Sequence, residues 1–145
     1  MRRALARWRA REAEERAALV EALAMLALAS ALVRFAPFRR IAALASRPTT
    51  RTPSEESERT VARTAWAIRA AARRVPFRAM CIEQGLAAQL MLRRRGAAST
   101  LHYGVSRDPA RGVAAHVWVT LAGRPVVGCE EATAFREVAR FPPQA

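Results

Sequence analysis

The sequence predicts an α+β fold, in which helices occupy about the first two thirds of the chain and a small antiparallel sheet follows. Up to about residue 95, the apolar residues recur at the 3.6-residue spacing of a helix that buries one side. From residue 101 onward they recur at every second position, which is the period of a strand. Clusters of Pro, Gly, Ser and Thr separate these segments.

The length of 145 residues is typical of one compact unit, in which we expect an N-terminal helical segment over residues 1–50 and a core over 51–145. All 25 basic residues are arginine, and against 12 acidic residues they leave a net charge of +13. Such a charge favours an anionic partner, whether nucleic acid, a membrane surface or an acidic peptide or protein. A solvated surface in an Ala- and Arg-rich composition explains it equally well.

Nucleic acid is not the partner we expect. The arginines are spread over the whole chain, without the aromatic interleaving, zinc-finger spacing or helix-turn-helix signature that would read bases. The two cysteines, Cys81 and Cys129, have neither the spacing of a disulfide framework nor that of a zinc ribbon. We therefore expect a cytoplasmic protein with reduced thiols and with no metal or other cofactor.

Residues 2–35 predict one long helix or two short ones. An apolar stripe predicts deep burial of the second half; it consists of Leu19, Leu23, Leu26, Ser30 and Val33, widened by Val20, Leu28 and Leu32. The apolar run over residues 22–33 has 12 residues, fewer than the roughly 20 that cross a bilayer, and it lacks the pattern of a signal peptide. It indicates a core helix, with a membrane-surface helix as the alternative.

Two further helices follow a connector over residues 46–57. Thr52, Pro53 and Glu55 match a capping box that would start the first of them, and Pro76 ends it. The second is predicted over residues 79–95, with Gly96 as its cap.

The strand pattern begins after this cap. One strand is centred on Leu101 and Tyr103, and a second covers residues 113–121. A turn at 122–123 leads to a returning strand over residues 124–129. The pattern of the last segment, residues 130–145, predicts a short helix with Phe135 and Val138 facing inward, followed by an irregular end.

Cys81 lies at the predicted start of a helix. The positive end of the helix dipole and the unpaired N–H groups there favour the thiolate over the thiol, and the same N–H groups could hold an oxyanion. A buried cysteine that only fills the core is the alternative.

His116 lies in the middle of a predicted strand, on the face opposite Val117 and Val119. An imidazole in this place could take a thiol proton and later protonate a leaving amine. The alternative is a histidine that only hydrogen-bonds a neighbour, and His102 is a weaker candidate for the base. A two-residue turn would pair His116 with Cys129, and a turn one residue longer would pair it with Gly128, so neither position supplies the acid that usually orients such a histidine.

At this point the sequence resembles a known family. The stretches "VPFRAMCIEQGLAAQLMLRRRGAASTLHYGVSRDP" and "AAHVWVTLAGRPVVG" are similar to the B2 proteins of lasso peptide biosynthesis, which are leader peptidases with a transglutaminase-like, papain-like core. The resemblance covers about residues 60–143. It implies a Cys-His-Asp triad that removes the leader from a ribosomally made precursor peptide, with Cys81 and His116 as nucleophile and base.

The resemblance also implies an aspartate where this chain has Gly128, and no asparagine is present to replace it. We favour Glu130 as the third member; Glu131, Asp108, a water molecule or a backbone carbonyl are the alternatives. Relatives often carry serine four residues after the nucleophile, where this chain has Gly85. We expect a groove beside Trp118 to accept the leader residue before the cut.

The implied partners are the leader region of the precursor, a separate leader-recognition protein of the B1 type and an ATP-dependent macrocyclase. The alternative to a peptidase is a non-catalytic basic module that binds nucleic acid or an anionic membrane surface and buries Cys81 in its core.

Overall fold

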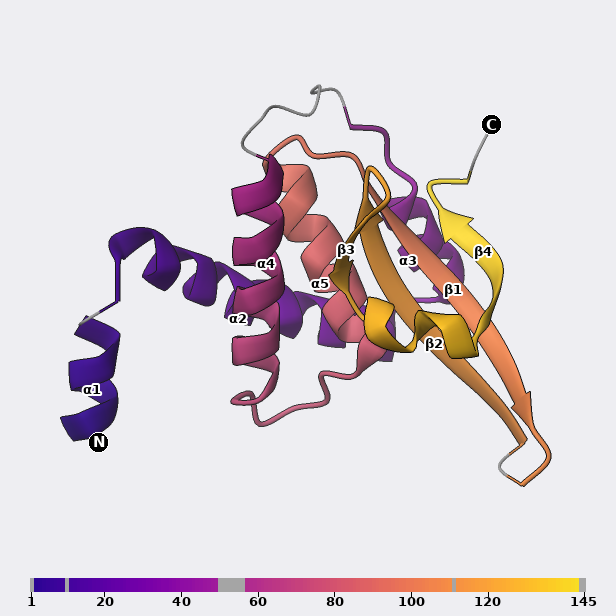
Figure 1. Ribbon diagram of the computed structural model, residues 1–145, viewed down its shortest axis with the longest axis horizontal. Coiled ribbons are helices and arrows are strands. Elements are labelled where there is room, and N and C mark those ends of the chain that lie inside the picture. Colours follow the sequence, from indigo (N-terminus) through magenta and orange to yellow (C-terminus); the bar gives the residue numbers. More distant parts are fainter. Residues whose placement is uncertain (1, 10, 50–56, 111, 144–145) are drawn as a thin grey trace.

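The computed structural model describes residues 2–9, 11–49, 57–110 and 112–143 (Figure 1). Its helices are α1 (Arg2–Arg9), α2 (Ala13–Phe35), α3 (Phe38–Ala45), α4 (Ser57–Ala72) and α5 (Cys81–Arg94). Its strands are β1 (Ser99–Asp108), β2 (Gly112–Leu121), β3 (Arg124–Val127) and β4 (Arg136–Phe141), with a 3-10 helix η1 (Cys129–Ala134) before β4. The predicted α+β class is confirmed.

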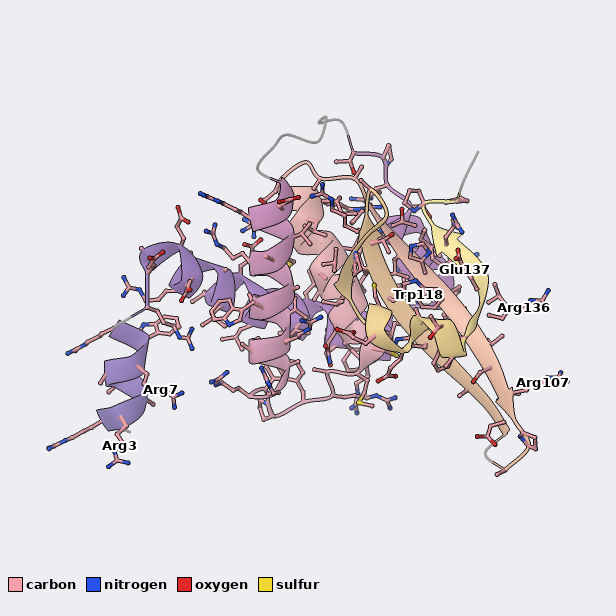
Figure 2. The ribbon with its side chains drawn as sticks, in the orientation of Figure 1. Arg3, Arg7, Arg107, Trp118, Arg136 and Glu137 are labelled. Carbon is pink, nitrogen blue, oxygen red and sulfur yellow. The ribbon has the colours of Figure 1, made fainter. Side chains whose placement is uncertain are left out.

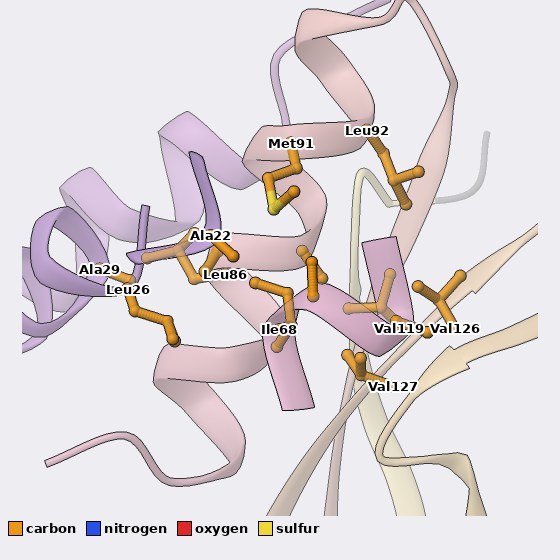
Figure 3. Packing of buried hydrophobic residues seen from close by; sticks show 14 of the residues in the cluster. Ala22, Leu26, Ala29, Ile68, Leu86, Met91, Leu92, Val119, Val126 and Val127 are labelled. Atoms are coloured by element: carbon orange, nitrogen blue, oxygen red, sulfur yellow. The ribbon is translucent and has the colours of Figure 1, made fainter. Parts of the chain in front are cut away.

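The four strands form one antiparallel sheet in the order β3-β2-β1-β4. Helix α5 lies against one face of this sheet, and α2 and α4 pack on α5 (Figure 1). Figure 3 shows side chains from these elements meeting in one core. The fully buried members include Leu26 of α2, Ile68 of α4, Leu86 and Met91 of α5, and Val119 of β2.

Helix α5 approaches the sheet closely because it carries a glycine at the contact. A Cβ atom on Gly85 would lie 2.7 Å from Cγ1 of Val117 and 3.6 Å from Cγ2 of Val119. Any larger side chain would therefore push the helix away from β2. The glycine keeps the first turn of α5, which begins with Cys81, next to the middle of β2.

The tail of the chain was predicted as a short helix, and this prediction was wrong. Residues 129–134 form η1, and residues 136–141 form β4, which pairs with the outer edge of β1. The edge of β1 offers backbone groups that would otherwise lack partners, and pairing with them outweighs a weak helical pattern. Val138, predicted to face inward, is 54 % exposed.

Helix α2 is buried on one side only, which corrects the predicted deep burial of its whole apolar stripe. Leu19 and Leu26 are buried with three alanines, whereas Val20, Leu23 and Leu28 are exposed. The alanines allow α2 to lie close to α4 and α5, but no element covers its outer side among the described residues. By length and composition α2 could cross a membrane, a test that the core helix of a soluble protein also passes. The predicted capping box at residues 52–55 lies outside the described residues.

Replacing Gly85 with alanine is expected to destabilise the fold. The gain in helix propensity of about 1 kcal/mol is smaller than the roughly 1–3 kcal/mol that overpacking against Val117 costs. Urea unfolding of Gly85→Ala, of Val117→Ala and of the double variant measures this directly. The double variant should be more stable than the sum of the single changes predicts. Simple additivity would show that the two residues do not limit the approach of α5.

Candidate active site

Cys81 is the first residue of α5 and is partly exposed. Glu83 caps the N-terminus of α5, because its buried carboxylate accepts a hydrogen bond from the backbone N–H of Met80 at 3.1 Å. Arg78 Nε lies 3.7 Å from the other oxygen of Glu83 and opposes its charge. The N–H groups of the first helical turn have no acceptor within the helix. They surround Cys81 and can stabilise negative charge that develops beside it.

His116 lies in the middle of β2, on the sheet face opposite the α5 contact, as the alternation predicted. The residue is 6 % exposed, and its ring stacks on Phe135 and Trp118, with centroid separations of 4.9 Å and 6.0 Å. Nε2 donates a hydrogen bond of 2.7 Å to the backbone carbonyl of Gly128. A carbonyl can only accept, so the neutral ring carries its proton on Nε2 and its lone pair on Nδ1. No described residue hydrogen-bonds Nδ1, which leaves this nitrogen free to act as a base.

Cys81 and His116 lie on adjoining segments of the fold. Cys81 and Gly85 share one side of α5, because four residues make about one turn. Gly85 contacts Val117, the residue next to His116. No hydrogen bond joins Cys81 Sγ to the imidazole among the described residues, and the ring of His116 lies on the sheet face opposite the α5 contact, so proton transfer between them requires a rearrangement that brings the two groups together.

The carbonyl of Gly128 stands at the place that the resemblance gave to an aspartate. The residue has φ of 74°, a left-handed conformation that favours glycine. A Cβ atom here would lie 2.7 Å from the carbonyl oxygen of Val117 and 3.3 Å from Nε2 of His116. Steric limits therefore exclude a side chain, and the main chain itself supplies the acceptor.

The predicted pairing of His116 with residue 128 or 129 was wrong. Leu121 pairs with Arg124 as expected, but a bulge between Val119 and Thr120 shifts the register. Strand β3 then ends at residue 127, before it reaches the level of His116. A bulge leaves no clear mark in the sequence, so the count from the turn could not reveal it.

The acidic candidates for the third member are bound elsewhere. Glu130 Oε1 accepts a hydrogen bond of 2.7 Å from Arg69 of α4 and does not hold His116. Asp108 accepts the backbone N–H of Ala110 at 2.8 Å, which shapes the turn after β1. A backbone carbonyl, one of the alternatives that the sequence left open, makes the contact to the histidine.

Trp118 is a packed part of the site, 8 % exposed, and is labelled in Figure 2. Its ring stacks on the rings of two histidines, on His102 at a centroid distance of 5.3 Å and on His116 at 6.0 Å. Gly104 of β1 makes room for this ring, since a Cβ there would lie 2.8 Å from the indole. Trp118 thus holds the imidazole in place, and its contact with a leader residue stays a prediction.

The contacts that hold His102 were not predicted from the sequence. Its Nε2 lies 2.8 Å from Thr120 Oγ1, and its Nδ1 lies 3.3 Å from Glu137 Oε1, without the alignment of a hydrogen bond. Burial disfavours the charged form of Glu137, but a hydrogen bond from Arg140 and the neighbouring His102 outweigh it and lower the pKa of Glu137. The register of β1 and β2 pairs His102 with Trp118, and Glu137 could not be found while the tail was predicted as a helix.

Cys129 is unsuited to nucleophilic attack. Burial, assisted by the charge of Glu130, raises the pKa of its thiol, and Sγ donates to the carbonyl of Val119 at 3.3 Å. A raised pKa leaves less thiolate at neutral pH. Across the described residues, no three His, Cys, Asp or Glu side chains gather as a metal site.

A cysteine at a helix start, packed beside a sheet that carries a histidine of fixed tautomer, is the arrangement of enzymes that transfer acyl groups through a thiol. The family model described as the transglutaminase-like superfamily matches residues 22–140, and the chain belongs to this superfamily. Its members are usually cysteine peptidases or acyltransferases, so the chemistry is of the cysteine-protease type in general. No curated protein and no solved structure matches the chain.

Replacing Gly128 with alanine is expected to cost more stability than the same change at Gly123. Both glycines have positive φ, 74° and 77°, but nothing lies within 4 Å of a Cβ on Gly123. Backbone strain of about 1–2 kcal/mol applies to both variants, and the clash with Val117 and His116 applies only to Gly128→Ala. Urea unfolding measures the difference, and imidazole NMR shows whether the slowly exchanging Nε2 proton of His116 is lost. Equal losses of stability and an unchanged Nε2 proton would contradict the tight contact.

Glu137 is expected to contribute stability that disappears in acid. Its pKa is lower in the folded chain than in the unfolded chain, so the contribution is present above the unfolded value and is lost as the pH falls through the folded value. Glu137→Gln should therefore weaken the protein at neutral pH, by up to about 1 kcal/mol for a partly exposed contact, and the difference should shrink as the pH falls through the folded pKa of Glu137. Glu131→Gln, at an exposed carboxylate, is the matched control. A pH-independent effect of Glu137→Gln would show that packing and not charge is responsible.

Proposed function

We propose that this protein is a cysteine peptidase that removes the leader from a ribosomally made lasso peptide precursor. The observation that carries the chemistry is the hydrogen bond from His116 Nε2 to Gly128, because it leaves Nδ1 as the base, and the helix that begins with Cys81 packs on the same strand. The superfamily supports a cysteine nucleophile in general. The finer assignment rests on the combination of motifs in the sequence, namely Pro-Phe-x-x-x-Cys before α5, Ala-His-x-Trp-Val in β2 and Gly-Arg-Pro-Val after the turn.

In the proposed reaction, a rearrangement first brings the His116 ring to Cys81, and Nδ1 then takes the proton of the thiol. The sulfur attacks the carbonyl carbon at the end of the leader, and the C=O π electrons move to oxygen, where N–H groups at the start of α5 hold the oxyanion. This tetrahedral intermediate then collapses, the peptide C–N bond breaks, and the imidazolium protonates the departing amine of the core peptide.

The leader now remains as a thioester on Cys81. Nδ1 takes a proton from a water molecule, whose oxygen attacks the thioester carbonyl. Collapse of this second tetrahedral intermediate breaks the C–S bond, the thiolate regains its proton and the leader leaves with a free carboxylate.

The site differs from a Cys-His-Asp triad in the charge of its third member. The Gly128 carbonyl fixes the ring tautomer as well as a carboxylate would, but as a neutral acceptor it stabilises the imidazolium less. We therefore expect slower turnover than a carboxylate would give, with the orientation of the His116 ring retained.

Trp118 also supports the His116 ring, so Trp118→Ala is expected to lower kcat even where it also raises KM.

The proposed partners follow from the same assignment. A separate B1-type protein would grip the leader and present it, and an ATP-dependent macrocyclase would close the freed core peptide. The net charge of +13 gives a physical reason why acidic segments of the precursor or of a partner would be attracted.

Cys81→Ala is expected to abolish cleavage of the precursor, because no other described residue supplies the nucleophile. The measurement is mass spectrometry of precursor incubated with this protein and the leader-recognition protein. Cys129→Ala is the matched control and should retain cleavage. If Cys81→Ala still released the leader, or if wild-type protein left the precursor intact while binding nucleic acid in a salt-sensitive manner, the peptidase proposal would be wrong.

A further inference from the structure

Helix α2 carries an uncovered apolar face along almost its whole length. The residues of this face share one side of the helix at 3.6-residue spacing and are all exposed: Ala17, Val20, Leu23, Ala24, Ala27, Leu28, Ala31 and Phe35. Val20 and Phe35 are 55 % and 79 % exposed. So long an apolar stripe on a surface indicates a binding face.

The acidic residues of α2 do not contribute to this face. Glu14 is bound by Arg63 of α4 at 2.6 Å, and Glu21 is bound by Arg95 at 2.6 Å. Glu15, the third acidic residue of α2, lies 3.5 Å from Arg11, so all three carboxylates are paired with arginines. Arg16 and Arg34 flank the two ends of the stripe, so its border is cationic.

Helix α1 extends the same surface. A groove of about 340 Å³ between α1, α2 and α4 is lined by Trp8 and Leu23 together with Arg7 and Arg74. Figure 1 shows α1 standing apart from the protein body, and Figure 2 shows the arginines Arg3 and Arg7 on it. An exposed tryptophan with arginines on a short helix is a composition typical of membrane interfaces.

The opposite end of the stripe has the same composition. Phe35 and Phe38 are exposed, and the guanidinium of Arg34 lies 5.6 Å from the centre of the Phe35 ring. Arg39 and Arg40 of α3 follow directly and are exposed. Aromatic and arginine side chains therefore border the apolar stripe at both ends. We name the surface formed by α1, the exposed side of α2 and the start of α3 the N-terminal face.

The charge of the face selects its occupant. A second copy of a chain with a net charge of +13 would be repelled, and the rims of protein interfaces mix both signs of charge and neutral polar groups. An anionic bilayer offers an apolar layer bordered by negative headgroups, which complements an apolar stripe bordered by arginines. We propose that the N-terminal face docks this protein on the surface of an anionic lipid membrane.

In this proposal α2 lies in the plane of the membrane surface and does not cross the bilayer. Its other side carries Ala22, Leu26 and Ala29, which are completely buried in the core with α4 and α5. A transmembrane position would expose the partners of these residues and would remove the support of α5. Figure 1 shows the free end of the β1–β2 hairpin far from α1, so the sheet stays open to solvent.

The test is flotation of the full chain with vesicles. We expect binding to vesicles of equal parts phosphatidylcholine and phosphatidylglycerol, little binding to pure phosphatidylcholine, and weakening at high salt. The variant Val20→Glu/Leu28→Glu should lower the partition coefficient by about tenfold or more, since it places two charges on the docking face. Val113→Glu, at a valine that is 70 % exposed on β2, is the matched control and should bind as wild type does.

Several outcomes would overturn the proposal. Equal binding to neutral vesicles, or no binding to anionic ones, would contradict an anionic membrane as the occupant. Resistance to an alkaline carbonate wash would indicate a spanning helix. A wild-type dimer in light scattering that the Val20→Glu/Leu28→Glu variant loses would identify a second copy of the chain as the occupant. Binding to an acidic protein but not to anionic vesicles would identify a protein partner instead. The wild-type dependence on lipid charge and salt tests the proposal even if the double variant folds poorly. Cys81→Ala should float as wild type does, and Val20→Glu/Leu28→Glu should retain cleavage in solution, so this proposal and the peptidase proposal can fail separately.

Discussion

The close approach of α5 to β2 is the contact on which the rest of the structure depends. It exists because Gly85 has no side chain to separate the helix from Val117 and Val119. With the helix at this distance, the core of α2, α4 and α5 closes against the sheet. The first turn of α5, with Cys81, then lies beside the strand that carries His116. Packing of the core and the position of Cys81 relative to β2 thus depend on one residue.

The histidine is oriented by the main chain, and this solution depends on the backbone of the hairpin. A bulge shortens the pairing of β2 with β3, and Gly128 then adopts a left-handed conformation that aims its carbonyl at Nε2. On the other side, the ring rests on Trp118 and Phe135, which restrict its rotation. The fold therefore achieves orientation without a charged group, and it gives up the additional stabilisation of an imidazolium that a carboxylate provides.

Helix α2 separates two tasks on its two sides. Its inner side is part of the core, where alanines bring it close to α4 and α5. Its outer side is apolar and uncovered among the described residues, while its acids are paired with arginines. A helix that is apolar all round satisfies the hydropathy of a membrane span, yet its inner contacts bind it to the fold, which is why we place it on a membrane surface.

The sequence by itself determined the fold class, the positions of most helices and strands, and the candidates Cys81 and His116, because periodicity and helix-start chemistry are local properties. It did not determine the third contact to the histidine, since a carbonyl has no residue type that marks it and the bulge before β3 changes the count. It also misassigned the tail, because β4 forms only where the edge of β1 offers partners. The burial of α2 depends on which elements pack against it, and only the tertiary structure shows that α4 and α5 cover one side of this helix.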